Sequence, residues 1–432
     1  MKQRDMVTVT PGIARGSVLI LPSKSIAHRA LICAALAPHG SVSRLTNLPY
    51  SEDIDATLDC LRALGAHLDE QCEAGGATRR VTVAGCGGQW TREDAPLSCR
   101  ESGSTLRFML PLCLLSDAKR TLTGSEKLLS RPLDDYATLL ERRGCMRTED
   151  GLCLGGGAPL MGGTYPLTGK SSSQFITGLL FVLPLLAEDS VIELPCVPES
   201  KSYIDMTIAV QARFGVRAVW IDETHLHVPG GQTFCAADMA IDGDASGAAF
   251  FRALDAMNEQ NNVEVSCRTS PDVHQGDAVC PALLADLKAA TRDDLPTISL
   301  ADCPDLGPVL FCAAAALGGA TFTHTDRLRL KESDRVAAMV EELEKFGAVC
   351  TVCDGQDGGT VTILPPPEGL HTPTEILHGH NDHRIVMSLS VLSACLKDAT
   401  PVTIDDAHAV SKSFPDFFSR LRRLGLSVKV NE

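Results

Sequence analysis

The sequence predicts an α/β protein of two domains, and three observations support this fold class. A unit made of a small polar or basic helix start and an apolar helix occurs six times along the 432 residues. In most copies an amphipathic helix that ends in glycine follows, together with short β-rich segments. The chain is too long for one ordinary hydrophobic core, so we expect three copies in each of two similar domains.

The first copy, LPSKSIAHRALICAAL at residues 21–36, shows the unit most clearly. Ser23 or Ser25 can cap the predicted helix, and Lys24 and Arg29 fall in its first turns. A helix start presents unpaired N–H groups and partial positive charge, so added cations make an anion site. The rest of the stretch is apolar on all sides, which predicts a buried helix.

The other five copies share this polar start and apolar run. They begin at residues 102, 171, 244, 304 and 381. Amphipathic second helices are expected at residues 53–65, 134–144, 335–347 and 415–425. The first helices should therefore be buried, with second helices and sheets outside them.

Glycines mark the ends of most second helices. They stand at positions 65, 144, 215, 347 and 425, and they predict left-handed C-caps. The copy at residues 282–291 has lost its glycine.

Composition restricts the partners and the compartment. Lys plus Arg number 39 against 54 Asp plus Glu, which gives a net charge of −15 and argues against nucleic acid or a membrane surface as partner. Any anion site must then be a local concentration of cations. No secretory signal precedes the 17 scattered cysteines, so we expect reduced thiols and a cytoplasmic protein.

Cations stand at or near the predicted helix starts in both halves. They are Lys24, Arg29, Arg107 and Arg131 in the first half, and Arg327, Arg329, Lys331, Arg335, Arg384 and Lys412 in the second. Any one alone is typical of a solvated or paired side chain. Together with the small hydroxyl residues, they predict the binding of a polyanion.

Two acids lie among these cations, Asp305 and Glu332, the latter beside Lys331. Lysine–carboxylate pairs shift proton affinities, which suits acid–base chemistry. The alternatives are an ion-pair network or, for Asp305 alone, a helix N-cap. The segment His378-Gly-His-Asn-Asp-His383 looks like a metal site, but its place directly before Arg384 at a helix start suits phosphate or carboxylate better. We expect no metal.

Several short motifs follow one another along the chain: Pro22-Ser-Lys-Ser25 with Arg29, Gly103-Ser104 with Arg107, Arg131-Pro132, Ser172-Ser-Gln174, Ser200-Lys-Ser-Tyr203, Pro304-Asp305, Lys331-Glu-Ser-Asp-Arg335, Asp382-His-Arg384, and Lys412 before Phe414-Pro-Asp416. In these motifs the sequence resembles the EPSP synthase (3-phosphoshikimate 1-carboxyvinyltransferase) family. They follow the family order over nearly the whole chain. Glu101 and Arg327 stand where the family often has asparagine.

The resemblance implies a fold and an activity. The fold would be a two-domain inside-out α/β barrel of six βαβαββ repeats, with residues 1–21 and 243–432 as domain I and 22–242 as domain II. The active site would lie in the cleft between them. The reaction would transfer the enolpyruvyl group of phosphoenolpyruvate to the 5-hydroxyl of shikimate 3-phosphate through a tetrahedral ketal and release phosphate. The resemblance further implies a monomer that needs no cofactor and is inhibited by glyphosate.

The family's site residues are carried over by motif. Shikimate 3-phosphate would be held by Lys24, Ser25, Arg29, Ser172, Ser173, Gln174, Ser200, Asp305 and Lys331. Phosphoenolpyruvate would lie among Lys24, Gly103, Arg131, Gln174, Arg335, Arg384 and Lys412. The catalytic candidates are Lys24, Asp305 and Glu332, and the sequence does not divide the acid and base roles among them.

Two rival interpretations remain. UDP-N-acetylglucosamine enolpyruvyl transferases share the repeat and the donor, but that family typically has Lys-Asn at Lys24-Ser25 and an active-site cysteine on a loop in the first half. Residues 119–131 contain no cysteine. The other rival is an inactive scaffold that binds anions, and the presence of Lys24, Asp305 and Glu332 argues against it.

Overall fold

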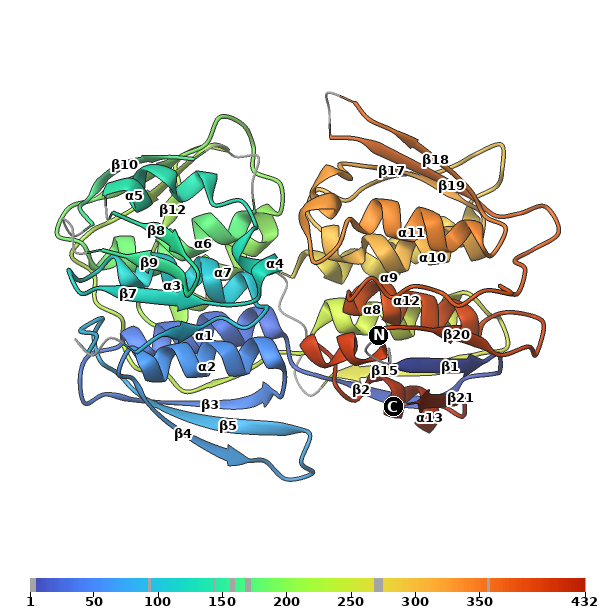
Figure 1. The fold of residues 1–432 in the computed structure, drawn as a ribbon, viewed down its shortest axis with the longest axis horizontal. Coiled ribbons are helices and arrows are strands. Elements are labelled where there is room, and N and C mark those ends of the chain that lie inside the picture. Colours follow the sequence, from blue (N-terminus) through green and yellow to red (C-terminus); the bar gives the residue numbers. More distant parts are fainter. Residues whose placement is uncertain are drawn as a thin grey trace. The chain divides into compact units, whose positions relative to one another are not determined.

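The computed structural model describes residues 5–91, 95–142, 144–155, 160–167, 172–267, 275–355 and 358–431. The chain forms two compact units, which we call unit 1 (Met1–Leu21 with Gly243–Glu432) and unit 2 (Pro22–Asp242). Each unit has its own hydrophobic core. Each also combines helices with small sheets, so the predicted mixed α/β class is confirmed (Figure 1).

The six apolar helices are buried along almost their whole length, as predicted. They are α1 (Lys24–Leu36), α3 (Gly103–Cys113) and α6 (Ser173–Val182) in unit 2, and α8 (Ala245–Ala256), α10 (Gly307–Ala316) and α12 (His383–Ala394) in unit 1. Every residue of α12 is buried, serines included. The expected start of the third copy at residue 171 lies outside the described residues, and α6 begins at Ser173.

The second helix of each copy buries only part of its surface. These helices are α2 (Glu52–Ala63), α5 (Ala137–Arg142), α7 (Lys201–Arg213), α9 (Cys280–Ala289), α11 (Arg335–Glu344) and α13 (Phe417–Arg423). The five predicted terminal glycines all have positive φ, from 58° at Gly144 to 100° at Gly65, which confirms the left-handed caps. In the copy without glycine, α9 is followed by Ala290 in an extended conformation.

Four copies contribute a four-stranded sheet with one common strand order. In each sheet the first two strands are parallel and the other neighbours are antiparallel. The orders are β14-β3-β5-β4, β6-β7-β9-β8, β10-β11-β13-β12 and β16-β17-β19-β18.

The strand bounds in unit 2 are β3 (Val42–Pro49), β4 (His67–Cys72), β5 (Thr78–Ala84), β6 (Leu97–Ser98), β7 (Arg120–Thr123), β8 (Met146–Thr148), β9 (Gly151–Leu154), β10 (Gly163–Pro166), β11 (Ser190–Glu193), β12 (Val219–Trp220), β13 (His225–Val228) and β14 (Met239–Ala240). The fourth sheet, in unit 1, has β16 (Thr297–Ser299), β17 (Ala320–Thr323), β18 (Val349–Cys353) and β19 (Thr360–Leu364). In Figure 1 the sheet of β3, β4 and β5 lies along one side of α1 and α2.

The other two copies, both in unit 1, have smaller sheets that include the N-terminal strands. Strand β2 (Arg15–Ile20) pairs in parallel with β15 (Asn262–Cys267). Strand β1 (Met6–Thr10) lies between β20 (Val402–Ile404) and β21 (Ser427–Asn431). The repeats are therefore unequal, and a closed barrel in each unit stays a prediction.

The chain leaves unit 1 after Leu21 and re-enters it at Gly243. Within unit 2, the backbone N–H of Ser23 donates to the carbonyl of Asp242 at 2.7 Å. Within unit 1, the N–H of Asp244 donates to the carbonyl of Leu21 at 2.9 Å. These segments lead directly into α1 and α8. In the described part of the chain no helix combines the length and the apolar character that crossing a membrane requires.

Candidate active site

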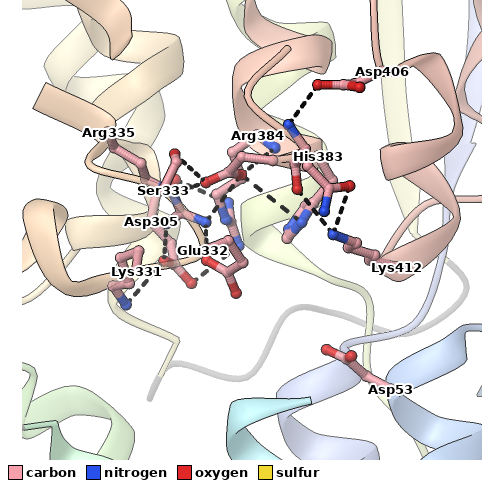
Figure 2. A network of polar contacts seen from close by, with 12 residues as sticks. Asp53, Asp305, Lys331, Glu332, Ser333, Arg335, His383, Arg384, Asp406 and Lys412 are labelled. Carbon is pink, nitrogen blue, oxygen red and sulfur yellow. Dashed lines mark hydrogen bonds and ion pairs between the residues drawn. The ribbon is translucent and has the colours of Figure 1, made fainter. Parts of the chain in front are cut away.

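In unit 1 the carboxylate of Asp305 lies among three cations (Figure 2). Asp305 belongs to the short 3-10 helix η4 (Pro304–Leu306) that leads into α10. Its oxygens lie 3.3 Å from Lys331 Nζ, 3.0 Å from Arg335 Nη1 and 3.0 Å from Arg384 Nη2. Neither η4 nor α10 has a side-chain cap, so the N-cap interpretation of Asp305 is wrong and the ion-pair network is what forms.

Arg335, at the first position of α11, is the most enclosed cation of this network. Its side chain is 1% exposed, and besides Asp305 it contacts Glu332 at 2.6 Å and Asp382 at 2.8 Å. Burial disfavours the charge, but Asp382, Glu332 and Asp305 together raise the pKa of Arg335 above its usual value. Arg335 is thus a permanent cation, and Glu332 pairs with it.

Lys331 follows the 3-10 helix η5 (Asp326–Leu330) and behaves differently. Burial lowers its pKa, the Arg335 and Arg327 charges lower it further, and Asp305 only partly opposes them. A lowered pKa makes the Lys331 ammonium a stronger acid than that of an ordinary lysine. The sequence marked Lys331 only as a binding residue, and the structure adds it to the groups that can move a proton.

The loop that precedes α12 contacts Lys412 and leads directly to Arg384, the second residue of that helix. Asp382 caps α12 by accepting from the N–H of Arg384 at 2.9 Å, and the Arg384 guanidinium donates to Ser246 Oγ at 2.6 Å. Lys412 Nζ donates to the carbonyl and the side-chain oxygen of Asn381 at 2.8 and 3.1 Å. Figure 2 shows Arg335, Arg384 and Lys412 gathered around this loop. All six predicted site residues of unit 1 therefore lie in one network.

In unit 2 Lys24 is the first residue of α1. Ser23 caps this helix by accepting from the N–H of Ile26, which decides between the two predicted caps. Lys24 Nζ lies 2.6 Å from Asp53 Oδ2, and the two side chains are 19% and 15% exposed. The sequence had marked Asp53 only as the start of a second helix, because nothing in it predicts the contact between α1 and α2.

Arg29, one turn further along α1, lies inside unit 2 and is 3% exposed. Its guanidinium donates to the carbonyl of Ser25 and to the hydroxyls of Thr207 and Thr177, at 2.7, 2.8 and 3.3 Å. A fourth bond, of 3.1 Å, reaches the carbonyl of Tyr203. Because all four acceptors are uncharged, burial lowers the pKa of Arg29 to about 10. Arg29 therefore joins α1, α6 and α7 and is not placed at an open helix start.

The start of α3 brings two guanidinium groups close to the backbone. A Cβ atom added to Gly103 would lie 2.7 Å from Arg131 Nη1 and 3.1 Å from Arg107 Nη1, so only glycine allows this approach. Gln174 fixes Arg107 by accepting its N–H at 2.9 Å, and it donates to Ser104 Oγ at 2.8 Å. Helix N–H groups and two guanidinium groups at one point suit an anion. Arg107, which had not been assigned to a ligand, belongs to this group.

The predicted serines lie near the start of α6. Ser172 caps the helix, and it lines a small pocket with Ser173, Asp135 and Glu199. Ser200, which is 2% exposed and has a left-handed φ of 57°, directly precedes α7. Two carboxylates in the pocket wall favour ligand hydroxyl groups over a phosphate at this point.

Among the described residues, one group has the spacing of metal ligands: Glu341, Glu342 and His380, with candidate ligand atoms within 4.8 Å of one another. Both carboxylate oxygens of Glu342 already accept from Lys345 Nζ, at 2.8 and 2.9 Å. The lysine ammonium therefore occupies the place of a cation.

Residues 10–421 match the family model of EPSP synthase (3-phosphoshikimate 1-carboxyvinyltransferase). The chain belongs to the EPSP synthase family. A 3-phosphoshikimate 1-carboxyvinyltransferase from Clostridium kluyveri is 35% identical over 435 residues, which cover 97% of each chain. The match spans both units, so the family assignment covers unit 1 and unit 2 alike.

Solved structures agree with this assignment at the level of the fold. The EPSP synthase from Acinetobacter baumannii is similar with a TM-score of 0.75 and 23% identity, over 99% of this chain and 100% of that one. The enolpyruvyl transferase NikO from Streptomyces tendae has a TM-score of 0.73 and 16% identity, over 99% of both chains. The EPSP synthase fold thus extends over the whole chain.

Proposed function

We propose that this member of the EPSP synthase family transfers the enolpyruvyl group of phosphoenolpyruvate to the 5-hydroxyl of shikimate 3-phosphate and releases phosphate. The observation that carries the proposal is the family match over residues 10–421. The site chemistry supports it, because cations gather at helix starts in a protein whose net charge is −15. Two anionic substrates explain such a concentration.

For phosphoenolpyruvate we propose the groups that suit a small dense anion: Lys24, Gly103, Arg131, Gln174, Arg335, Arg384 and Lys412. Arg131 and Arg107 lie beside the backbone of Gly103. Their planar guanidinium groups can each donate two parallel hydrogen bonds to the oxygens of a carboxylate or a phosphate. In unit 1, Arg335 and Arg384 are held by Asp305, so they meet the ligand in a fixed geometry.

For shikimate 3-phosphate we propose Lys24, Ser25, Arg29, Ser172, Ser173, Gln174, Ser200, Asp305 and Lys331. Arg29 would act by holding the carbonyl of Ser25, since its guanidinium is enclosed. Asp135 and Glu199 next to Ser172 and Ser173 suit the ring hydroxyls of a shikimate.

The proposed chemistry is an addition followed by an elimination. The 5-hydroxyl oxygen bonds to the central carbon of phosphoenolpyruvate, its proton goes to a base, and an acid protonates the methylene carbon to give a methyl group. The carbon–oxygen bond to phosphate then breaks, and a base removes one methyl proton to restore the double bond. Lys24, Asp305 and Glu332 are the proposed proton carriers, and the lowered pKa of Lys331 makes it a fourth candidate.

A phosphate-release assay tests the function directly. The purified chain is given phosphoenolpyruvate with shikimate 3-phosphate or with UDP-N-acetylglucosamine as acceptor. Turnover with shikimate 3-phosphate alone is expected. Turnover only with the nucleotide sugar would replace the proposal by the rival transferase, and no turnover with either would favour an anion-binding scaffold. Inhibition by glyphosate that phosphoenolpyruvate relieves is expected in the same assay, as is unchanged activity with a chelator.

At the level of the fold we propose that residues 22–242 form domain II, that 1–21 with 243–432 form domain I, and that each is an inside-out α/β barrel. The buried helices of each unit support this proposal. We also propose a monomer that binds no nucleic acid. Light scattering after gel filtration tests the monomer, and a stable fragment 22–242 would support the boundary.

A further inference from the structure

The loop before α12, residues 378–382, presents acceptors to the cations of unit 1. Asn381 accepts from Lys412 through its carbonyl and its side chain. Asp382 accepts from the Arg335 guanidinium at 2.8 Å and caps the helix on which Arg384 stands. Any movement of this loop would therefore move the partners of Lys412 and Arg335, together with the start of the helix that carries Arg384.

The loop backbone is unusual. His380 and Asn381 follow one another with φ of 52° and 51°, a left-handed conformation that residues with a Cβ adopt only when their surroundings hold them there. A Cβ atom added to Gly379 would lie 2.5 Å from a methyl of Val386 and 2.6 Å from the carbonyl of Asp405. The loop is thus strained and closely packed, so something must fix it.

Three carboxylates, which we call the carboxylate clamp, accept from the backbone of this loop. Glu342 Oε2 accepts from the N–H of His378 at 3.0 Å, Asp405 Oδ1 from Gly379 at 2.7 Å, and Asp406 Oδ2 from Asn381 at 2.8 Å. Glu342 and Asp405 are buried, at 0% and 2% exposure. Asp406 and Lys412, both labelled in Figure 2, contact Asn381 at its backbone N–H and at its two oxygens, respectively.

Side-chain contacts add to the clamp. His378 Nδ1 lies 2.9 Å from Asp405 Oδ2, and His380 Nε2 lies 3.7 Å from Glu342 Oε1. Lys345 compensates the buried charge of Glu342. Bonds from N–H groups to ionised carboxylates are stronger than those to neutral acceptors, so they can hold a backbone conformation that is unfavourable by itself.

We propose that Glu342, Asp405 and Asp406 are positioning residues that hold the loop so that Lys412, Arg335 and Arg384 are set for the donor substrate. The inference rests on the proposed function in one respect, the assignment of these cations to phosphoenolpyruvate. In this proposal the three clamp residues act through the loop backbone, whose N–H groups they accept from.

Asp406 offers a matched pair of variants, because its own φ is 54°. Asp406→Gly removes the acceptor carboxylate, and glycine adopts the left-handed φ without strain. Asp406→Asn keeps a side-chain acceptor oxygen, and asparagine also tolerates this φ. We expect Asp406→Gly to raise the KM for phosphoenolpyruvate about tenfold and to leave the KM for shikimate 3-phosphate within about twofold. Asp406→Asn should stay within about twofold of the wild type for both. Equal KM values in the two variants, or an equal rise for both substrates in Asp406→Gly, would overturn the proposal.

Hydrogen exchange without substrates tests the clamp independently of the reaction. In Asp406→Gly, amides 378–382 should exchange at least about tenfold faster than in the wild type. In Glu342→Gln the same amides should exchange faster, whereas Glu341→Gln, which removes a neighbouring exposed charge, should match the wild type. Unchanged exchange in Asp406→Gly and Glu342→Gln would refute the clamp. If the wild type lacks the proposed activity, the function fails and this exchange result still decides the clamp.

Discussion

Two buried arginines, Arg335 in unit 1 and Arg29 in unit 2, are held in different ways. Arg335 contacts three carboxylates, whereas the four acceptors of Arg29 are carbonyl and hydroxyl oxygens. Their pKa values accordingly move in opposite directions, up for Arg335 and down to about 10 for Arg29. At Arg335 carboxylates of the protein supply the counter-charge, and at Arg29 dipoles and packing hold the cation.

The difference indicates what each arginine contributes. A cation fixed by carboxylates keeps its position and orientation whether or not an anion is bound, which favours pre-organised binding. A cation held by neutral oxygens joins helices and depends on burial. The comparison leads to five predictions, given from the largest expected effect to the smallest.

Replacing Arg335 should destabilise unit 1 most strongly. In Arg335→Met, Asp382 and Glu332 lose their main partner inside the protein, and breaking such buried pairs costs about 3–5 kcal/mol. Urea unfolding measures the free energy. Arg329→Met is the control, because Arg329 pairs near the surface with Asp354, and it should change little. A loss as small as that of the control would mean that the carboxylates do not depend on Arg335.

Lys24→Met should leave the fold intact and lower kcat at least about a hundredfold, or about 2.7 kcal/mol of barrier, the scale of a positioned acid–base group. Its partner Asp53 is partly exposed, so solvent limits the cost in stability. Steady-state kinetics measure the effect, with Lys127→Met as the exposed control. A near-normal rate would remove Lys24 from the mechanism.

Arg29→Met sharpens the comparison with Arg335. Only neutral acceptors are left behind, so the expected loss is about 1–3 kcal/mol of unfolding free energy. Arg44, exposed and paired with Asp238, is the control for this unit. A loss as large as that of Arg335→Met would contradict the distinction between the two arginines.

Arg384→Ala should raise the KM for phosphoenolpyruvate about tenfold, which corresponds to about 1.4 kcal/mol, and the KM for shikimate 3-phosphate far less. The reason is that Arg384 stands at the start of α12 among the cations proposed for the donor. Equal effects on both substrates would contradict that assignment.

The smallest effect concerns His28, the neighbour of Arg29 on α1. Burial, followed by the charges of Lys24 and Arg29, holds the pKa of His28 well below its usual 6.5. The unfolded chain therefore binds a proton that the folded protein excludes, and stability falls as the pH drops below about 6.5, by up to about 1.4 kcal/mol per pH unit. His28→Asn should remove this slope in urea unfolding at pH 5.5 and 7. An unchanged slope would assign the pH dependence to other groups.

The sequence predicted what depends on local pattern. The run of apolar residues in α10 predicted burial, and Gly65 and Gly347 marked the helix ends because left-handed φ strongly favours a residue without Cβ. Strand β14 was not predicted as the first strand of the β3 sheet, because that pairing joins residues nearly two hundred positions apart.

The site followed the same rule. The motifs identified Lys331, Arg335 and Arg384, because charged residues at or near predicted helix starts can be recognised from the sequence alone. The sequence named Asp305 and Glu332 as acids among these cations, but it did not show which cation each contacts. Ser246 was noted only as part of a helix start and Asp382 only as part of a motif, so neither was identified as a partner. For Asp305 the sequence left a helix N-cap open as an alternative, because its three cations come from other elements. Which acid meets which base is decided by tertiary packing.

The bonds at the two chain crossings have a consequence for how the protein folds. Ser23 and Asp242 hold together the ends of unit 2, and Leu21 and Asp244 hold together the two parts of unit 1. In polymer terms unit 2 is a long loop whose closure entropy grows only slowly with length, so its insertion costs unit 1 little. Each unit can therefore complete its own hydrophobic core while the other unit is still unfolded. A circular permutant with the original termini joined and new termini within unit 2 would make unit 1 one continuous stretch of sequence.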